Sequence, residues 1–463
     1  MEQTPRHTRY RRRQRLRALL LLVILPAAAL LALRLAWGWE ASSRLTSVKA
    51  EMQRKGFPIG LQRPVDHPLN KLKALFPANL TTAESALIWG ADGASSVWKM
   101  DWNAVDRASL EIALARFQPA LDAIPALAAE PAPDAPAELD AGLGSFRQLA
   151  NVLEAQARLA VDAGNSRQGL VATERILQLA NLAERGRTLI HSLVATAIRA
   201  VAARTVEEMQ PRLKLNAADG SLAEAKRLRE MLSDPASAGR PAYCMEGEIA
   251  LQEVFLKYVP ALDHWWIRPL ADDGIARSMA TIDRAMDGFR AENWVKSQRL
   301  LAPFFQPDSD DNLFHMVHWN EDGLASTGRS MTLYFRARCD MNAASILLAS
   351  AIFEAERQRQ PQTLAELVPN YLPSAPADFF TEGQPMHFRL DPGGVTVWSV
   401  GEDGIDQGAV MKYEITGEPA RRYDNRNPSS QKDIIYGAAW HMRLPAPVPA
   451  PAPAPAAAPL PGA

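Results

Sequence analysis

Residues 18–37, ALLLLVILPAAALLALRLAW, decide how the rest of this chain is organised. The stretch is apolar except for Arg34, and it has the ~20 residues that one helix needs to cross the hydrocarbon core of a bilayer. Arg34 lies near one end, where its long side chain can reach the membrane surface. Trp37 and Trp39 follow, and tryptophan is enriched at the same boundary. We therefore predict a transmembrane anchor over residues 18–39.

The flanks of this stretch predict its orientation. Arginine occupies seven of the first 17 positions, and Glu2 is the one opposing charge there. Because cationic flanks stay on the cytoplasmic side, residues 1–17 are predicted to be a basic cytoplasmic tail. The sequence thus predicts a single-pass protein of the inner membrane, with the lipid bilayer as a partner and a periplasmic body. A cleaved signal peptide is the alternative, but the apolar run continues past Ala29 to Leu33, beyond the 7–15 residues typical of such peptides.

Composition narrows the classes of function. The 463 residues leave room for two or three domains. The net charge is −1 with the basic tail included, so the body is mildly acidic and a nucleic-acid partner is not expected. The two cysteines are Cys244 and Cys339. In an oxidising compartment they form either one disulfide or two separate buried thiols, and the sequence leaves both readings open.

The strongest helical pattern lies within residues 141–330, which we take as a helical domain. Apolar residues at helical spacing predict three helices over 146–209, with short turns at 164–165 and 184–186. Helices of this length joined by tight turns are typical of antiparallel hairpins. The segments outside this domain include an irregular and helical connector over 40–140 and a disordered tail, rich in proline and alanine, over 441–463.

Residues 331–440 predict a small α+β module. One helix is expected over 332–360, because Pro361 ends it. The sequence MHFRLD at 386–391 alternates apolar and polar residues, which is typical of a strand with one buried face, and a return strand is expected over 395–400. An isolated hairpin is only marginally stable, so the helix is expected to pack against it. The predicted fold class is mainly α, with a small C-terminal α+β module and an N-terminal transmembrane helix.

The order of motifs in this module is similar to that of a known family. PQTLAELVPNYLPSAPADFF (361–380) and MHFRLDPGGVTVWSVGEDGIDQG (386–408) resemble the globular domain of type II secretion major pseudopilins, over about 336–440. That resemblance implies a helix followed by a small antiparallel sheet, and contact with an envelope assembly of the secretion or pilus kind. The N-terminal span lacks the glycine cleavage site and the glutamate that those proteins use, so a pilus subunit is not expected.

The same resemblance implies a calcium site after the return strand. In pseudopilins this loop and a downstream Asp-Ile pair hold calcium, and the matching positions here are Asp403, Asp406 and Asp433. Calcium binds six to eight oxygen ligands from carboxylates, carbonyls and water, which an acidic, glycine-containing loop can offer. The loop departs from the family because it is shorter and carries Gln407 and Ala409. The alternative is an Asp-Gly turn whose carboxylates cap backbone amides.

A second hypothesis concerns residues 263–320, which are rich in tryptophan, histidine and aspartate. His315 and His318 lie one helical turn apart, after Asp308, Asp310 and Asp311, and such a set can ligate zinc. Two interfacial or core histidines are the alternative. The primary expectation is a scaffold or adaptor without catalytic activity that has envelope proteins as partners. A periplasmic metal-dependent hydrolase that uses residues 263–320 is the runner-up.

Overall fold

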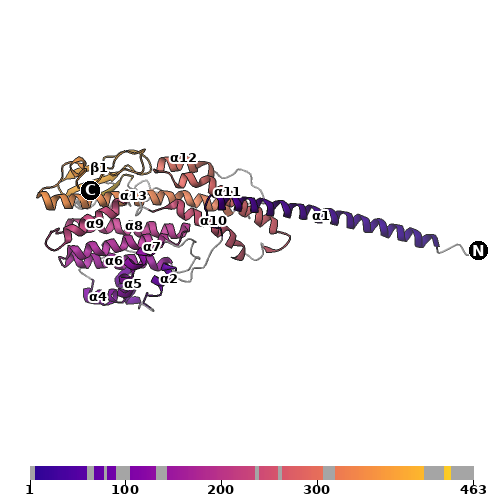
Figure 1. Cartoon of the computed structure of the whole chain (residues 1–463), viewed down its shortest axis with the longest axis horizontal. Helices are drawn as coiled ribbons and strands as arrows, with labels where there is room; N and C mark the ends of the chain where they lie inside the picture. The colour runs from indigo at the N-terminus through magenta and orange to yellow at the C-terminus, as the bar shows by residue number, and fades with distance from the viewer. Residues whose placement is uncertain are drawn as a thin grey trace, which may run out of the picture.

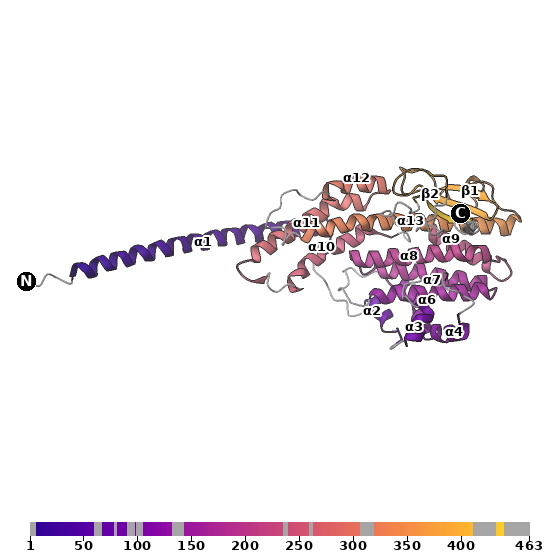
Figure 2. The same cartoon turned by 180° about the vertical axis from the view of Figure 1, so that it is seen from behind.

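The computed structural model describes residues 6–59, 67–77, 81–89, 98, 105–131, 143–234, 239–258, 263–305, 319–410 and 432–438. Within these ranges the chain is mostly helical and carries one three-stranded antiparallel sheet, which confirms the predicted class at that level. A long helical stalk at the N-terminus projects from an elongated body, and the sheet lies at the end of the body away from the stalk (Figures 1 and 2). The tail over 441–463 lies outside the described residues.

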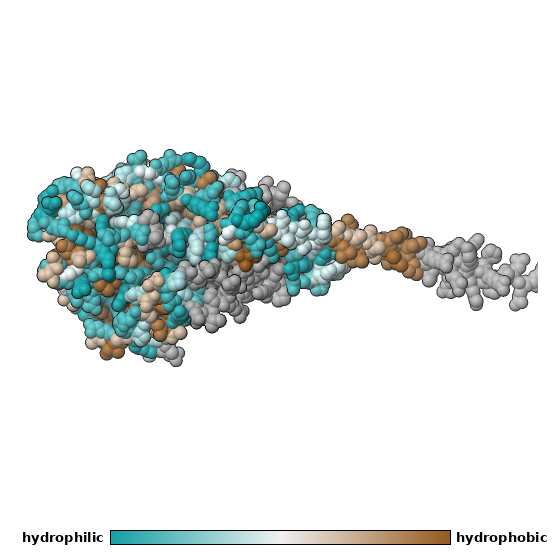
Figure 3. All heavy atoms as spheres, viewed as in Figure 1, coloured by the Kyte–Doolittle hydropathy of each residue, from teal (hydrophilic) through white to brown (hydrophobic). Residues whose placement is uncertain are grey.

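The stalk is α1 (Arg6–Arg54), one continuous helix of 49 residues. At 1.5 Å per residue it is about 73 Å long, more than twice the thickness of a hydrocarbon core. Of the residues in its apolar window only 6% are buried, and Figure 3 shows this part as a hydrophobic section of the stalk beside a mostly hydrophilic body surface. The helix continues past the predicted anchor to Arg54, and its last turns pack along α11 (Arg268–Phe289).

By length and composition, two helical stretches of the described chain are apolar enough to cross a membrane, Leu20–Arg54 and Leu189–Arg212. The second is 61% buried and belongs to α8 (Leu189–Met209), a core helix of the body. α8 stacks with α6 (Leu143–Asp162) and α7 (Ser166–Glu184), which confirms the three predicted hairpin helices to within a few residues.

Side-chain caps explain where two of these helices begin. Asn165 accepts a hydrogen bond from the backbone amide of Gln168, and Thr188 accepts one from that of His191. Shorter helices lie against the α6–α7 side of this stack: α2 (Pro68–Lys73), α3 (Thr82–Trp89), α4 (Arg107–Ala115) and α5 (Gln118–Ala129).

α13 (Trp319–Arg357) is the central helix of the other half of the body. It packs on α8, on α9 (Ser221–Ser233), on α12 (Trp294–Phe305) and on the sheet, while α10 (Pro241–Tyr258) packs on α8 and α11. The prediction of a helix over 332–360 is right in kind, but α13 begins 13 residues earlier and accommodates Gly323 and Gly328. Its first turns therefore belong to the segment that the sequence assigned to the helical domain.

The sheet has the order β1-β2-β3, all antiparallel: β1 (His387–Asp391), β2 (Gly394–Ser399) and β3 (Ile434–Gly437). The predicted hairpin is confirmed, with Phe388 opposite Val397. The sequence did not predict β3. This strand pairs with the edge of β2 that faces away from β1, and it places Tyr436 opposite Val397. Gly437 has φ +77°, and an added Cβ would lie 2.3 Å from the Val395 carbonyl oxygen, so this close strand contact requires glycine.

The two cysteines are separate buried thiols, which settles the alternative that the sequence left open. Cys244 is on α10 and Cys339 is on α13. Burial raises the pKa of both thiols well above the ordinary value. Each thiol therefore stays protonated and packs as a small apolar group.

Candidate functional site

The three aspartates proposed as calcium ligands gather around the turn that follows β2. Asp433 accepts hydrogen bonds from the backbone amides of Gln407 at 3.1 Å and Ala409 at 3.0 Å. Asp406 accepts from the amide of Gly408 at 2.8 Å and from the indole of Trp398 at 2.9 Å. The turn is thus closed by carboxylates that cap its own backbone.

Asp403 completes this turn with a different set of partners. Its carboxylate accepts from the backbone amide of Ile405 at 3.1 Å and from the side-chain amide of Gln407 at 3.1 Å. The Lys432 ammonium lies 3.4 Å from it. A bound cation would have to displace or share these donors.

The charge state of the turn follows from burial. Burial raises the pKa of Asp433, and the negative charges of Asp406 and Asp403 add to this effect while the amides oppose it. Burial by itself would raise the pKa of Asp406 as well, but the hydrogen bonds from Trp398 and Gly408 outweigh it, so the pKa of Asp406 is lowered overall. Across the described chain, no group of three or more histidine, cysteine, aspartate or glutamate side chains is arranged to hold a metal ion. Calcium binding stays a prediction, and calorimetric titration of the purified chain with calcium tests it.

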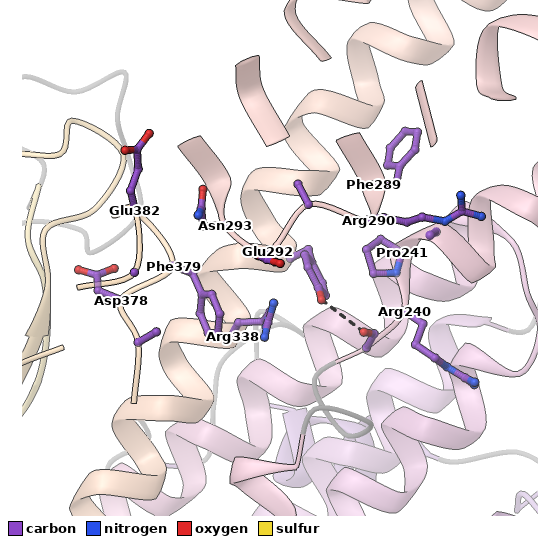
Figure 4. Close-up of a pocket in the computed structure, with 16 residues that line it drawn as sticks. Arg240, Pro241, Phe289, Arg290, Glu292, Asn293, Arg338, Asp378, Phe379 and Glu382 are labelled. Atoms are coloured by element: carbon purple, nitrogen blue, oxygen red, sulfur yellow. Dashed lines mark hydrogen bonds between the residues drawn. The ribbon is translucent and has the colours of Figure 1, made fainter. Parts of the chain in front are cut away.

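The body also holds a cavity of about 570 Å³ where the helical domain meets the C-terminal module (Figure 4). Three segments far apart in the sequence line it: residues 239–242 at the start of α10, residues 289–293 between α11 and α12, and residues 377–383 before the sheet. Tyr334 and Arg338 of α13 form its floor. They are one helical turn apart, so α13 presents both on the same face.

Arg338 is the residue that gives the cavity its chemistry. Its guanidinium lies 3.6 Å from the centre of the Phe379 ring, a cation–π contact that Figure 4 shows side by side. Within the described structure, the Nε of Arg338 is buried and has no hydrogen-bond partner. Tyr334 donates its hydroxyl proton to the Gly239 carbonyl oxygen at 3.3 Å, the dashed line in Figure 4, and burial raises its pKa.

A buried carboxylate fixes the wall that carries Phe379. Asp378 accepts hydrogen bonds from the Ser399 hydroxyl at 2.8 Å, from the Val400 amide at 2.9 Å and from the Phe380 amide at 3.0 Å. These bonds join the 377–383 segment to the end of β2. Asp378 is therefore a positioning residue for this wall, and its carboxylate accepts from these three groups and from the Cys339 thiol at 3.7 Å.

The cavity wall is also tied to α12. The backbone amide of Trp294 donates to the Phe379 carbonyl oxygen at 2.9 Å, and the Trp294 ring packs 5.6 Å from that of Phe380. At the rim, Glu382 pairs with Arg299 at 3.0 Å. A guanidinium in contact with a ring can still offer hydrogen-bond donors to a carboxylate or amide in the cavity, so this arrangement is chemically suited to binding.

The structure does not test the hydrolase hypothesis, because its residues fall in a stretch that is not described. His315, His318, Asp308, Asp310 and Asp311 lie outside the described residues. Of the aromatic residues in the same stretch, Trp265 and Trp266 lie on the turn before α11, whereas Trp294 packs beside the cavity. The hypothesis of a metal site in residues 263–320 therefore stays a prediction.

The sequence reasoning did not find the cavity residues. Tyr334 and Arg338 were visible only as helical positions, and the pair Phe379-Phe380 only as part of a family motif. A signal was present in the spacing of Tyr334 and Arg338, but their partners come from loops that no local pattern connects. No family model, curated protein or solved structure matches this chain.

Proposed function

We propose that this chain is a single-span scaffold or adaptor of the inner membrane. Residues 1–17 lie in the cytoplasm, the body lies in the periplasm, and the protein has no catalytic activity of its own. The observation that carries this proposal is the division of α1 into two parts. In the apolar part only 6% of the residues are buried, whereas the part that follows is packed into the body.

Contacts along α1 and α11 support a rigid link between span and body. Ala41, Leu45 and Met52 are buried in this contact region. Two ion pairs join the same helices, Arg44 with Asp273 and Lys55 with Asp283, the second at 2.6 Å. Because their order is the same on both helices, α1 and α11 run parallel and α11 begins at the membrane end.

A rigid link of this kind suits a scaffold. A helix that enters the membrane and then packs over several turns sets the angle and height at which the body is held. A flexible linker would instead leave the angle and the height of the body variable. The link to a secretion or pilus-type assembly rests on the motif order in the C-terminal module, together with its arrangement of one long helix, α13, under a small antiparallel sheet.

We propose the cavity around Arg338 as the place where a partner contacts the body. It lies between the helical domain and the module, so a partner bound there touches both. A photoreactive amino acid at Glu382, which lies on the rim and is exposed, is expected to crosslink an envelope protein in intact membranes. The matched control is Ile112, which is 70% exposed on α4. Equal adducts at both positions, or none at Glu382, would contradict the assignment.

A further inference from the structure

One surface outside the span is exposed, apolar and continuous with it. Trp265, Trp266 and Ile267 are consecutive residues of the turn before α11, and their exposed fractions are 47%, 50% and 37%. The other exposed large apolar side chains that the structure describes outside α1 are scattered singly along the chain. Single exposed apolar residues are ordinary on protein surfaces, but three together call for a partner.

This turn is fixed to α1 near the end of the apolar stretch. The Arg34 guanidinium lies 4.7 Å from the centre of the Trp265 ring, and its Nε donates a hydrogen bond to the Trp266 carbonyl oxygen at 3.0 Å. Gly38 permits the close approach: an added Cβ would lie 2.6 Å from the Arg34 guanidinium and 3.6 Å from the Pro269 ring. The turn and residues 34–38 of α1 therefore lie at the same height along the stalk.

The helix geometry sets that height relative to the bilayer. Arg34 is about 24 Å along α1 from Ala18, at 1.5 Å per residue, and the hydrocarbon core is about 30 Å thick. If the apolar stretch fills the core, Arg34 lies roughly 6 Å inside the far boundary and Trp37 lies close to it. The turn is attached at this level, where tryptophan side chains are enriched.

The same contacts explain how a cation is tolerated so close to lipid. Arg34 is 8% exposed, so its charge is covered by protein at the level of the membrane surface that the sequence predicted it to reach. The Trp265 ring and the Trp266 carbonyl supply the electrostatic partners that an arginine needs at this depth. Trp37 adds a second ring, with its centre 6.0 Å from the guanidinium.

The charges around the turn do not oppose a membrane contact. Asp263 and Asp272 both pair with Arg268, and Asp273 pairs with Arg44 and Arg277. Acidic groups beside the turn are therefore neutralised by neighbours, which reduces their repulsion from anionic headgroups. The two indoles and Ile267 are exposed on this turn, next to His264 and to Asp263, which is exposed but paired with Arg268.

We propose that Trp265, Trp266 and Ile267 insert into the headgroup region of the leaflet that faces the body. This second membrane contact, which rests on the proposed anchoring by α1, fixes the tilt of the body relative to the bilayer. A single helix can rotate and tilt in lipid, whereas a helix with an attached aromatic turn has a preferred side facing the surface. The occupant of the patch is lipid, because the patch is continuous with a lipid-facing helix.

Spin-label depth measurements on the full chain in nanodiscs of phosphatidylethanolamine and phosphatidylglycerol test this proposal. A nitroxide at Ile267→Cys is compared with one at Leu22→Cys inside the span and one at Ile405→Cys, which is 61% exposed in the acidic turn next to the sheet. Cys244 and Cys339 are buried, so labelling is selective. The label at residue 267 is expected to collide more with oxygen than with an aqueous nickel chelate, as at residue 22 and unlike residue 405.

Replacing both tryptophans, Trp265→Ser and Trp266→Ser, is expected to move the collision ratio at residue 267 most of the way to that at residue 405. A residue 267 label that behaves like residue 405 with both tryptophans present overturns the proposal. The proposal is also overturned if the label at residue 267 collides little with either oxygen or the nickel chelate, because this would indicate that protein covers it. If the label at residue 22 is also aqueous, the anchoring itself fails, so the two failures are distinguishable. Circular dichroism confirms that each variant is folded.

Discussion

The stability of the helical body is predicted to fall in mild acid because of His191. This side chain is 2% exposed at the start of α8, and burial, with a smaller contribution from His67, lowers its pKa from 6.5 to about 4. The ring fits against Gly186, where an added Cβ would lie 2.0 Å from it, and its Nδ1 lies 2.6 Å from the Thr188 hydroxyl. The imidazole is therefore held neutral.

The sign of the pH effect follows from the two pKa values. Above pH 6.5 the imidazole of His191 is neutral in both the folded and the unfolded chain, and stability is not penalised. As the pH falls from 6.5 to 4, the unfolded chain binds a proton that the folded chain binds only near pH 4. The full loss is about 3 kcal/mol, of which about 2 kcal/mol falls between pH 7 and pH 5.

Urea unfolding in detergent micelles, followed by far-ultraviolet circular dichroism at pH 7 and pH 5, measures this loss. His191→Gln is the comparison, because it removes the titrating ring and leaves the other groups in place. Burial raises the pKa of Glu248 and Glu174, which favours the folded state in acid, but this opposing effect is common to both proteins. The variant should lose about 2 kcal/mol less than the wild type between the two pH values. If the wild type and His191→Gln lose the same free energy of unfolding between pH 7 and pH 5, the assignment of the acid effect to His191 is refuted.

Three further predictions concern groups that hold the body together. Arg199→Met should cost about 3 kcal/mol in urea unfolding, since it removes the guanidinium 3.2 Å from the Glu184 carboxylate, which is 2% exposed and keeps the Arg240 guanidinium at 3.8 Å; adding Glu184→Gln should restore part of the loss. Asp378→Ala removes the acceptor for three donors and should cost about 3 kcal/mol or more, with weaker crosslinking at the cavity rim. Gly437→Ala should lower the melting temperature more than Gly383→Ala, because both have positive φ but Gly383 has nothing within 4 Å of an added Cβ. Equal melting temperatures for these two would contradict the close-contact argument.

Much of the fold was accessible from local sequence signals. The helices of the hairpin stack follow from apolar spacing, and their starts follow from capping residues such as Asn165 and Thr188. The β1–β2 hairpin follows from alternation around the DPGG reversal. These features depend on neighbours within a few residues, which is the range over which a pattern can be read.

The remainder depends on contacts between distant segments. β3 has only four residues and pairs with β2 across more than 30 residues of chain, so no period marks it as a strand. The cavity around Arg338 combines residues from α10, α13 and two loops. The turn at Trp265 was visible as an aromatic cluster, but its position against Arg34 comes from the packing of α1 on α11.

The central claim is that α1 crosses the membrane with its arginines inside and the body outside. Labelling of single cysteines at Arg9→Cys and Ile405→Cys with a membrane-impermeant maleimide, in intact and in lysed spheroplasts, tests this most directly. The buried thiols of Cys244 and Cys339 keep the background low. The account predicts labelling of residue 405 in intact spheroplasts and of residue 9 only after lysis. Labelling of residue 9 in intact spheroplasts, or of residue 405 only after lysis, would contradict it.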